Sequence, residues 1–220
     1  MHGTLYIVAT PIGNLKDITF RAIETLKTTD LIAAEDTRHT KILTSHYGIN
    51  TALTSYFEHN KITKGEYLMR LLKEGKNIAL VSDAGTPGIS DPGAHIIRKA
   101  IENNITVIAI PGPSAFLAAI CASGKATDKF IYEGFLPVKK GARQNRLKAL
   151  AAEKRTIVFY ESPHRLLKTL EDILEVLGDR DIVVSRELTK KFEEIRREKT
   201  SALIEHFQKI HPKGELVIVI

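Results

Sequence analysis

Residues 78–93, which read IALVSDAGTPGISDPG, give the clearest indication of the fold. Residues 78–82 form a short apolar run of the length and composition of a buried strand. The eleven residues that follow, 83–93, contain three glycines, two prolines and two aspartates. Glycine and proline fix tight turns and leave backbone amides open to a ligand. We therefore interpret 83–93 as a ligand-binding loop at the end of a strand, with a purely structural loop as the alternative.

The same pattern of strand, loop and helix extends outward through the first half of the chain. Helices are predicted from an N-cap at Thr19, over 66–74 and around 96–101. Strands separated by helices pair in parallel through right-handed crossovers, and their carboxyl ends build the ligand site. The fold class is therefore predicted to be α/β. The predicted strands of this half are 5–9, 31–34, 78–82 and 105–110.

The second half begins after a polar segment at 123–129, which predicts domains at 1–122 and 123–220. Its clearest helix has Ser162 as a predicted N-cap, Pro163 in the first position and Gly178 after the last turn. The predicted strands of this half are 130–135, 156–160, 181–185 and 215–220.

Composition and charge narrow the class of protein. The 220 residues carry a net charge of +6 and a single cysteine, Cys121, which has no partner for an internal disulfide. This composition, with no recognisable signal peptide, predicts a reducing, cytoplasmic location. The apolar stretch 106–124 is broken by prolines, which argues against a membrane span. The net charge is compatible with a polyanionic substrate.

The common nucleotide and metal motifs are absent. The chain has neither G-x-G-x-x-G nor a glycine-rich loop ending in Gly-Lys-Ser/Thr, and its eight histidines are scattered singly, so no metal site is predicted. A second turn, at 110–115, places Ser114 near a helix start, whose free amides suit a carboxylate. A turn required only by packing is the alternative there.

Five segments carry a resemblance to a known family: 3–15 (GTLYIVATPIGNL), 34–38 (AEDTR), 82–93 (SDAGTPGISDPG), 111–115 (PGPSA) and 159–165 (FYESPHR). In this order they resemble the small-subunit ribosomal RNA methyltransferases of the tetrapyrrole methylase superfamily. The resemblance implies two α/β domains, with a mostly parallel N-terminal sheet and a mixed C-terminal sheet. It also implies that S-adenosylmethionine binds in the cleft between them.

The resemblance further implies 2′-O-methylation of a cytidine ribose in the decoding region of 16S rRNA, on the small ribosomal subunit, by a homodimer. Members that methylate tetrapyrroles usually carry a Gly-Pro-Gly-Asp core where this chain has residues 10–14, which favours the RNA branch. The implied cofactor-binding residues are Pro11, Asp83, Ala84, Gly85, Thr86, Pro111, Gly112, Ser114, Ala115, Phe159, Tyr160 and Leu188.

Methyl transfer to a ribose hydroxyl requires alignment of the acceptor and a nearby base. Glu35, Asp36 and Arg38 leave one strand end together, and Asp83 leaves another. We expect one carboxylate to orient or deprotonate the hydroxyl while Arg38 holds a phosphate. The alternative is that Glu35 and Arg38 pair with each other and only shape the loop.

Two basic clusters are candidates for RNA contact. The first is expected to contact phosphates, although it also reads as the solvated face of a helix. Competing hypotheses for the whole chain are a tetrapyrrole methyltransferase, an RNA-binding module without activity and a nicotinamide-dependent oxidoreductase, the last lacking its fingerprint. The first cluster contains Lys139, Lys140, Arg143, Arg146 and Lys148, and the second contains Lys190, Lys191, Arg196, Arg197 and Lys199.

Overall fold

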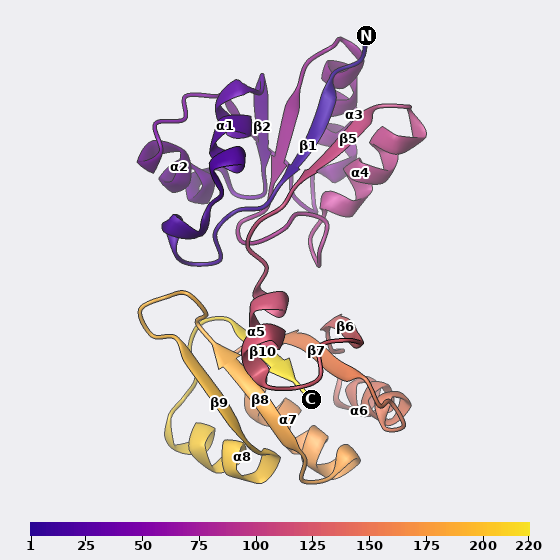
Figure 1. Ribbon diagram of the computed structural model, residues 1–220. Coiled ribbons are helices and arrows are strands. Elements are labelled where there is room, and N and C mark those ends of the chain that lie inside the picture. Colours follow the sequence, from indigo (N-terminus) through magenta and orange to yellow (C-terminus); the bar gives the residue numbers. More distant parts are fainter. The chain divides into compact units, whose positions relative to one another are not determined.

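The computed structural model describes all 220 residues, which form two compact units, Met1–Ser114 and Ala115–Ile220 (Figure 1). The division lies earlier than the predicted one after residue 122. Helix α5 (Ala115–Ser123), which was expected to close the first domain, packs instead against strands β7, β9 and β10 of the second unit.

The first unit is a parallel five-stranded sheet with helices on both faces, in the strand order β3-β2-β4-β1-β5. The strands are β1 (Thr4–Val8), β2 (Leu31–Ala34), β3 (Leu53–Ser55), β4 (Ile78–Val81) and β5 (Thr106–Ile110). The helices are η1 (Leu15–Asp17), α1 (Phe20–Thr28), α2 (Thr37–His46), α3 (Lys61–Lys73) and α4 (Gly93–Glu102).

Strand β4 lies at the centre of this sheet, and all four of its residues are buried. A continuous apolar run is what a strand covered on both faces requires. One core contains Leu68 and Leu72 of α3 with Ile96 of α4, and the other contains Leu26 of α1 with Leu43 of α2. The helices therefore cover the sheet in pairs, as Figure 1 shows.

The second unit is a mixed five-stranded sheet in the order β6-β7-β10-β8-β9. Strands β6 and β7 are parallel, and every other neighbouring pair is antiparallel. The strands are β6 (Phe130–Phe135), β7 (Thr156–Glu161), β8 (Asp181–Arg186), β9 (Glu194–Lys199) and β10 (Leu216–Val219). The remaining helices are α6 (Lys140–Leu150), α7 (Leu166–Leu177) and α8 (Thr200–Lys209).

Helices α6, α7 and α8 build the main core of this unit against one face of the sheet. Leu147 of α6, Leu170 of α7 and Phe207 of α8 are buried there with Phe159 of β7. The observed architecture confirms the predicted fold class, with a parallel first sheet and a mixed second one.

Several element boundaries follow the sequence prediction, and others do not. Thr19 caps α1 as expected, its Oγ1 accepting from the Ala22 N–H at 3.1 Å. Phe20 is 93% exposed, because Ala22 and Leu26 form the buried side of that helix.

The helix predicted to start at Ser162 begins only at Leu166. Residues 162–165 form a preceding turn, in which the Ser162 carbonyl accepts from the N–H groups of Arg165 and Leu166, both at 3.0 Å. Strand β9 was missed, since its sequence EIRREK lacks the apolar alternation of a half-buried strand.

Candidate functional site

All five strands of the first sheet run in the same direction, and four of the loops that leave its carboxyl edge follow β1, β2, β4 and β5. These loops contain most of the residues predicted to bind the cofactor or to act in catalysis. The loop after β4 is the longest of the four and occupies the centre of the edge, as the position of β4 in the sheet requires.

The cofactor loops contact one another directly. Thr10 and Gly85 exchange two backbone hydrogen bonds, of 2.9 and 3.0 Å, which tie the loop after β1 to the loop after β4. Thr86 Oγ1 donates to the Pro113 carbonyl at 3.2 Å, which adds the loop after β5. Gly85 has φ +82°, a conformation that favours glycine over any residue with a side chain. Three segments distant in sequence are thus held together.

This arrangement fits a polar cofactor. The backbone N–H groups of Ala84 and Gly112 donate no hydrogen bond within the chain, and both residues are exposed. Close packing also leaves no room for a larger residue at Gly112, where a Cβ would lie 2.9 Å from the Ala9 Cβ. Free amide donors beside small residues are suited to the carboxylate and hydroxyl groups of a ligand such as S-adenosylmethionine.

The predicted catalytic carboxylates Glu35 and Asp83 come together at the ends of β2 and β4. Asp83 Oδ1 accepts from the Asp36 N–H at 2.9 Å, and the Asp83 N–H donates to Glu35 Oε2 at 3.5 Å. Burial, together with the negative charge of Asp83, raises the pKa of the Glu35 carboxyl. A carboxylate with a raised pKa is a better proton acceptor near neutral pH.

Asp36 and Arg38 are engaged with each other. Asp36 caps α2 by accepting from the Arg38 N–H at 2.8 Å, and its carboxylate also accepts from the Arg38 guanidinium at 2.7 and 3.1 Å. These hydrogen bonds from Arg38 lower the pKa of Asp36. Arg38 therefore pairs with Asp36 rather than with Glu35, and its side chain is 91% exposed.

A hollow beside Glu35 contains polar residues that sequence reasoning missed, Tyr56 and Asp91. Asp91 accepts from the N–H groups of Gly88 and Gly93 at 2.8 and 2.7 Å, and burial raises its pKa. The Tyr56 hydroxyl lies 3.3 Å from His95 Nδ1, and burial raises its pKa to about 12. The Asp-Pro-Gly sequence before α4 was the available signal for Asp91.

The second unit corrects one predicted cofactor contact. Phe159 is fully buried in the core beneath α6, α7 and α8, so its side chain is not available to a ligand. Tyr160 points to the opposite face, where its ring lies 5.4 Å from Tyr132 and 5.5 Å from Phe135. Burial raises the pKa of Tyr160. The side chain of Leu188 is also buried.

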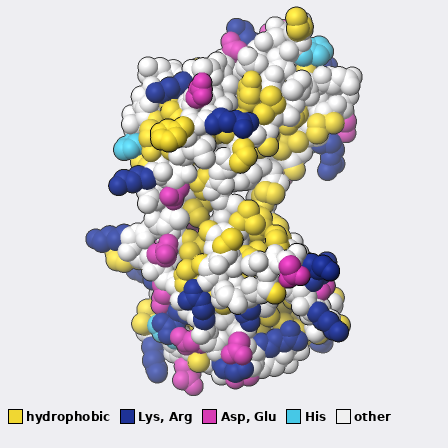
Figure 2. Space-filling view, in the orientation of Figure 1, with side chains coloured by type: hydrophobic (Ala, Val, Ile, Leu, Met, Phe, Trp, Pro, Cys, Tyr) yellow, Lys and Arg dark blue, Asp and Glu magenta, His cyan; other side chains and the backbone are white.

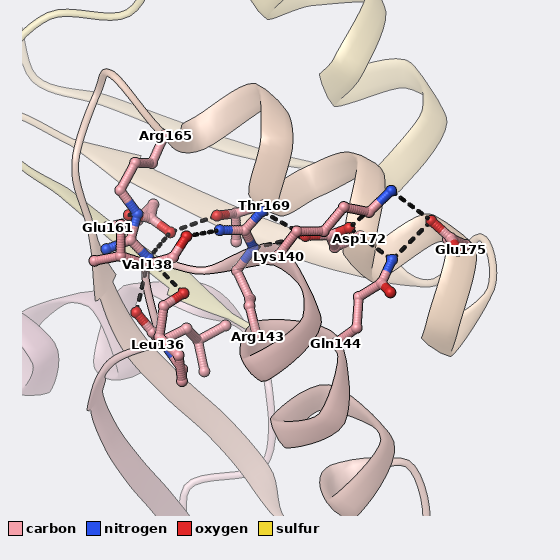
Figure 3. A network of polar contacts seen from close by, with 11 residues as sticks. Leu136, Val138, Lys140, Arg143, Gln144, Glu161, Arg165, Thr169, Asp172 and Glu175 are labelled. Carbon is pink, nitrogen blue, oxygen red and sulfur yellow. Dashed lines mark hydrogen bonds and ion pairs between the residues drawn. The ribbon is translucent and has the colours of Figure 1, made fainter.

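The first basic cluster is only partly a solvated surface. Arg143 is 4% exposed, and its Nε donates to Asp172 Oδ2 at 2.6 Å, as Figure 3 shows. Gln144 also donates to Asp172, at 2.9 Å. The prediction that Arg143 contacts phosphate is wrong, because the guanidinium joins α6 to α7 inside the unit.

Two other members of this cluster are exposed but paired. Arg146 makes two hydrogen bonds to Glu133, of 2.6 and 2.7 Å, and Lys140 lies 3.4 Å from Glu175. Lys139 forms no ion pair. On the face drawn in Figure 2, Lys and Arg side chains are interspersed with Asp and Glu rather than forming one continuous basic patch.

Segment 159–165 has a largely structural role. Glu161 is buried and accepts from Thr169 Oγ1 at 2.5 Å and from the Ser162 N–H at 2.7 Å, and it lies 3.3 Å from Arg165 Nε (Figure 3). Arg165 also donates to the Leu136 carbonyl at 2.7 Å. These contacts fix the turn that precedes α7.

Comparison with known proteins assigns the family. The profile described as Tetrapyrrole (Corrin/Porphyrin) Methylases matches residues 4–204. The chain is 54% identical to ribosomal RNA small subunit methyltransferase I of Synechocystis sp., over 99% of this chain and 78% of the relative. The corresponding values are 52%, 99% and 77% for the protein of that name from Escherichia coli O157:H7. The chain belongs to this methyltransferase family.

A further member, from Thermotoga maritima, is 50% identical over 99% of this chain and 98% of its own length. Among solved structures, a uroporphyrin-III-C-methyltransferase from Thermus thermophilus has a TM-score of 0.71 at 18% identity and covers 99% of this chain and 94% of its own. A diphthine synthase has a TM-score of 0.76 at 15% identity, with 99% and 90% covered. These two share the fold alone. The family assignment establishes that this chain is an S-adenosylmethionine-dependent methyltransferase.

None of the helices of this chain is both long and apolar enough to cross a membrane.

Proposed function

We propose that this methyltransferase transfers the methyl group of S-adenosylmethionine to the ribose 2′-oxygen of a cytidine in the decoding region of 16S rRNA. The observation that carries the proposal is the identity of 50–54% with ribosomal RNA small subunit methyltransferases I over nearly the whole chain. The tetrapyrrole enzymes share only the fold, at 18% identity, and therefore do not support a porphyrin acceptor.

The residues that would hold the cofactor lie in the three joined loops of the first unit, around Pro11, Asp83–Thr86 and Pro111–Ala115. The backbone around Tyr160 and Leu188 of the second unit is also proposed to bind the cofactor. S-adenosylmethionine supplies an electrophilic methyl group. The protein contributes free backbone amides and small side chains, which hold the cofactor in a fixed orientation.

Glu35 is the proposed general base. Its carboxylate has a raised pKa and is not committed to an ion pair, whereas Asp36 already serves as a helix cap and as the partner of Arg38. Asp83 then positions the loops by accepting from the Asp36 N–H. The exposed Arg38 side chain is free to exchange its carboxylate partner for a phosphate of the substrate.

The proposed partner is the small ribosomal subunit. Its phosphates would be contacted by Lys139, Lys140 and Arg146, whose side chains are exposed. Contacts of this kind position an RNA without reading its sequence. We also propose a homodimer and a cytoplasmic location. The single Cys121, which is free, is compatible with a reducing compartment.

The test is transfer of labelled methyl groups to small ribosomal subunits that lack the modification, followed by mapping of the label. Label at one ribose 2′-oxygen in the decoding region supports the proposal. Label on a base or at another site would reject the proposed acceptor. Calorimetry of S-adenosylmethionine on the same sample separates a wrong acceptor from an inactive preparation.

A further inference from the structure

The loop between β8 and β9, residues 187–193, presents an aromatic ring to solvent. Phe192 is 64% exposed, and the Lys191 ammonium lies 5.6 Å from the centre of its ring. Phe192 belongs to none of the hydrophobic clusters of the unit. Single exposed apolar residues are common and need no explanation by themselves. The backbone that carries Phe192, however, is unusually constrained.

Two residues of this loop adopt left-handed backbone conformations without being glycine. Glu187 has φ +50° and Thr189 has φ +68°, which is a strained value for a β-branched residue. Strain of this kind persists only where surrounding contacts fix the backbone, and it concentrates at binding and active sites. The loop therefore has a defined shape.

Internal contacts fix that shape. Lys190 donates to Glu187 at 2.8 Å and to Glu215 at 3.1 Å, and the Thr189 N–H donates to Glu193 at 2.5 Å. Close packing adds to this, since a Cβ at Gly214 would lie 2.1 Å from Glu187 Oε1. The side chains of Glu187, Lys190 and Glu193 are thus used internally, while Lys191 and Phe192 are left facing outward.

The charges of the second basic cluster distinguish Lys191 from the others. Arg196 pairs with Glu194 and Glu198, Lys199 pairs with Asp181, and Arg197 donates to the Ala122 carbonyl. Lys190 is held by its two glutamates. Lys191 is the one cation of this cluster with neither a carboxylate nor a carbonyl partner in the chain, its one contact being the Phe192 ring. It therefore remains available to an anionic ligand.

A second exposed aromatic ring beside an unpaired lysine lies at the end of β6. Strand β6 is parallel to β7, and β7 and β8 are both antiparallel to β10. Strands β6 and β8 therefore run in the same direction and end on the same side of the sheet. The end of β6 exposes Phe135 and Val138 beside the unpaired Lys139. Aromatic side chains beside unpaired cations are the features with which proteins bind single-stranded nucleic acid.

We infer that Phe192 and Lys191 are an RNA contact, in which the ring stacks on an unpaired base and the ammonium binds a neighbouring phosphate. This inference rests on the proposed function, since it names the part of the protein that grips the RNA substrate. Stacking on an aromatic side chain tolerates any base. The contact therefore contributes affinity for the small subunit without choosing the nucleotide that is methylated.

The test compares F192A, F192W, F192L and K191A with the wild type and with I101A, a control that removes an exposed apolar side chain at the end of α4. Binding to small subunits is measured by sedimentation, and the KM for subunits is measured at saturating S-adenosylmethionine. F192A is expected to weaken binding by about five-fold to a hundred-fold, and F192W to restore it. K191A should reduce the slope of log affinity against log salt by about one.

Three results would overturn the inference. The first is binding by F192A within two-fold of the wild type. The second is an equal loss in calorimetric affinity for S-adenosylmethionine, which would place Phe192 in the cofactor site. The third is restoration by F192L as fully as by F192W, which would indicate apolar docking to a ribosomal protein. A wild type that binds subunits but transfers no methyl group rejects the proposed function alone. The comparison of subunit binding between the variants and the wild type still tests the role of the loop.

Discussion

The backbone N–H of Asp36 donates to the Oδ1 atom of Asp83 at 2.9 Å, so a side chain continues the link between β2 and β4 beyond their last paired residues, Ala34 and Val81. The two residues lie far apart in the chain but at adjacent strand ends. This bond holds the proposed base, Glu35, beside the loop that would hold the cofactor.

Removing that bond is expected to cost stability. D83A leaves the Asp36 N–H without a partner, a loss of about 1–3 kcal/mol for a buried donor and less for this partly buried one. D83N keeps an acceptor oxygen and should be closer to the wild type. Urea unfolding of both variants makes the comparison. Equal stability of D83A and the wild type would show that water replaces the carboxylate.

Glu35 gives a prediction about pH. Its folded pKa is raised, so the folded state binds a proton more tightly than the unfolded state does, and wild-type stability falls as pH rises above the ordinary value of 4.5. E35Q removes this loss. The variant should be more stable than the wild type at pH 7, with the difference disappearing toward pH 4. Thermal unfolding over that pH range provides the check.

The same substitution tests catalysis. If Glu35 is the base, E35Q should reduce kcat by about 100-fold or more while leaving the affinity for S-adenosylmethionine unchanged. D36N serves as the comparison, because asparagine keeps the cap of α2 while removing a neighbouring carboxylate. A kcat for E35Q within a few-fold of the wild type would eliminate Glu35 as the base.

The buried Arg143–Asp172 pair predicts a large effect on stability. D172A leaves a guanidinium buried without its carboxylate and should cost about 3–5 kcal/mol. The double variant R143M/D172L removes both charges and should recover much of that loss. D181A breaks an exposed pair with Lys199 and is expected to cost about 0–1 kcal/mol. Guanidinium unfolding of the three variants tests the order.

Two glycine substitutions test the close packing of the cofactor loop, one at Gly112 in the loop and one at Gly141 in α6 as a control. G112A would place a Cβ 2.9 Å from the Ala9 Cβ, so the loop must move, at a cost of about 1–3 kcal/mol, and affinity for S-adenosylmethionine should fall. In α6, a Cβ at Gly141 meets nothing within 4 Å, and G141A should stabilise the helix by about 0.5–1 kcal/mol. Calorimetry that shows unchanged cofactor affinity in G112A would place the cofactor elsewhere.

The sequence predicted the first sheet well because its strands are short apolar runs between amphipathic helices. The run ending at Val81 and the loop from Asp83 both lie where periodicity and composition place them. Strand β3 and helix α2 of the first unit, and strand β9 and helix α8 of the second, were missed. Both strands lie at the edges of their sheets, and charged residues dominate β9, which an edge strand tolerates.

The site was harder to predict, because partners distant in sequence decide it. In the sequence, nothing near Arg143 indicates that the distant Asp172 pairs with it. The basic cluster therefore looks fully exposed in the sequence, although Arg143 is buried. Phe159 and Tyr160 are neighbours in one strand, but only the packing of helices decides which of them is covered. Asp91 and Tyr56 reach the hollow beside Glu35 from separate elements.

The position of β10 also affects how the protein is made. Strands β7 and β8 each pair with β10, so they remain separated until the ribosome has synthesised residues 216–219. The compact first unit ends at Ser114, and N-terminal units generally fold first during synthesis. Before residues 216–219 are synthesised, the backbone edges of β7 and β8 that pair with β10 are open to chaperones and to aggregation. Slowed translation near residue 216 is thus expected to harm the yield of this protein more than a pause just after the first unit.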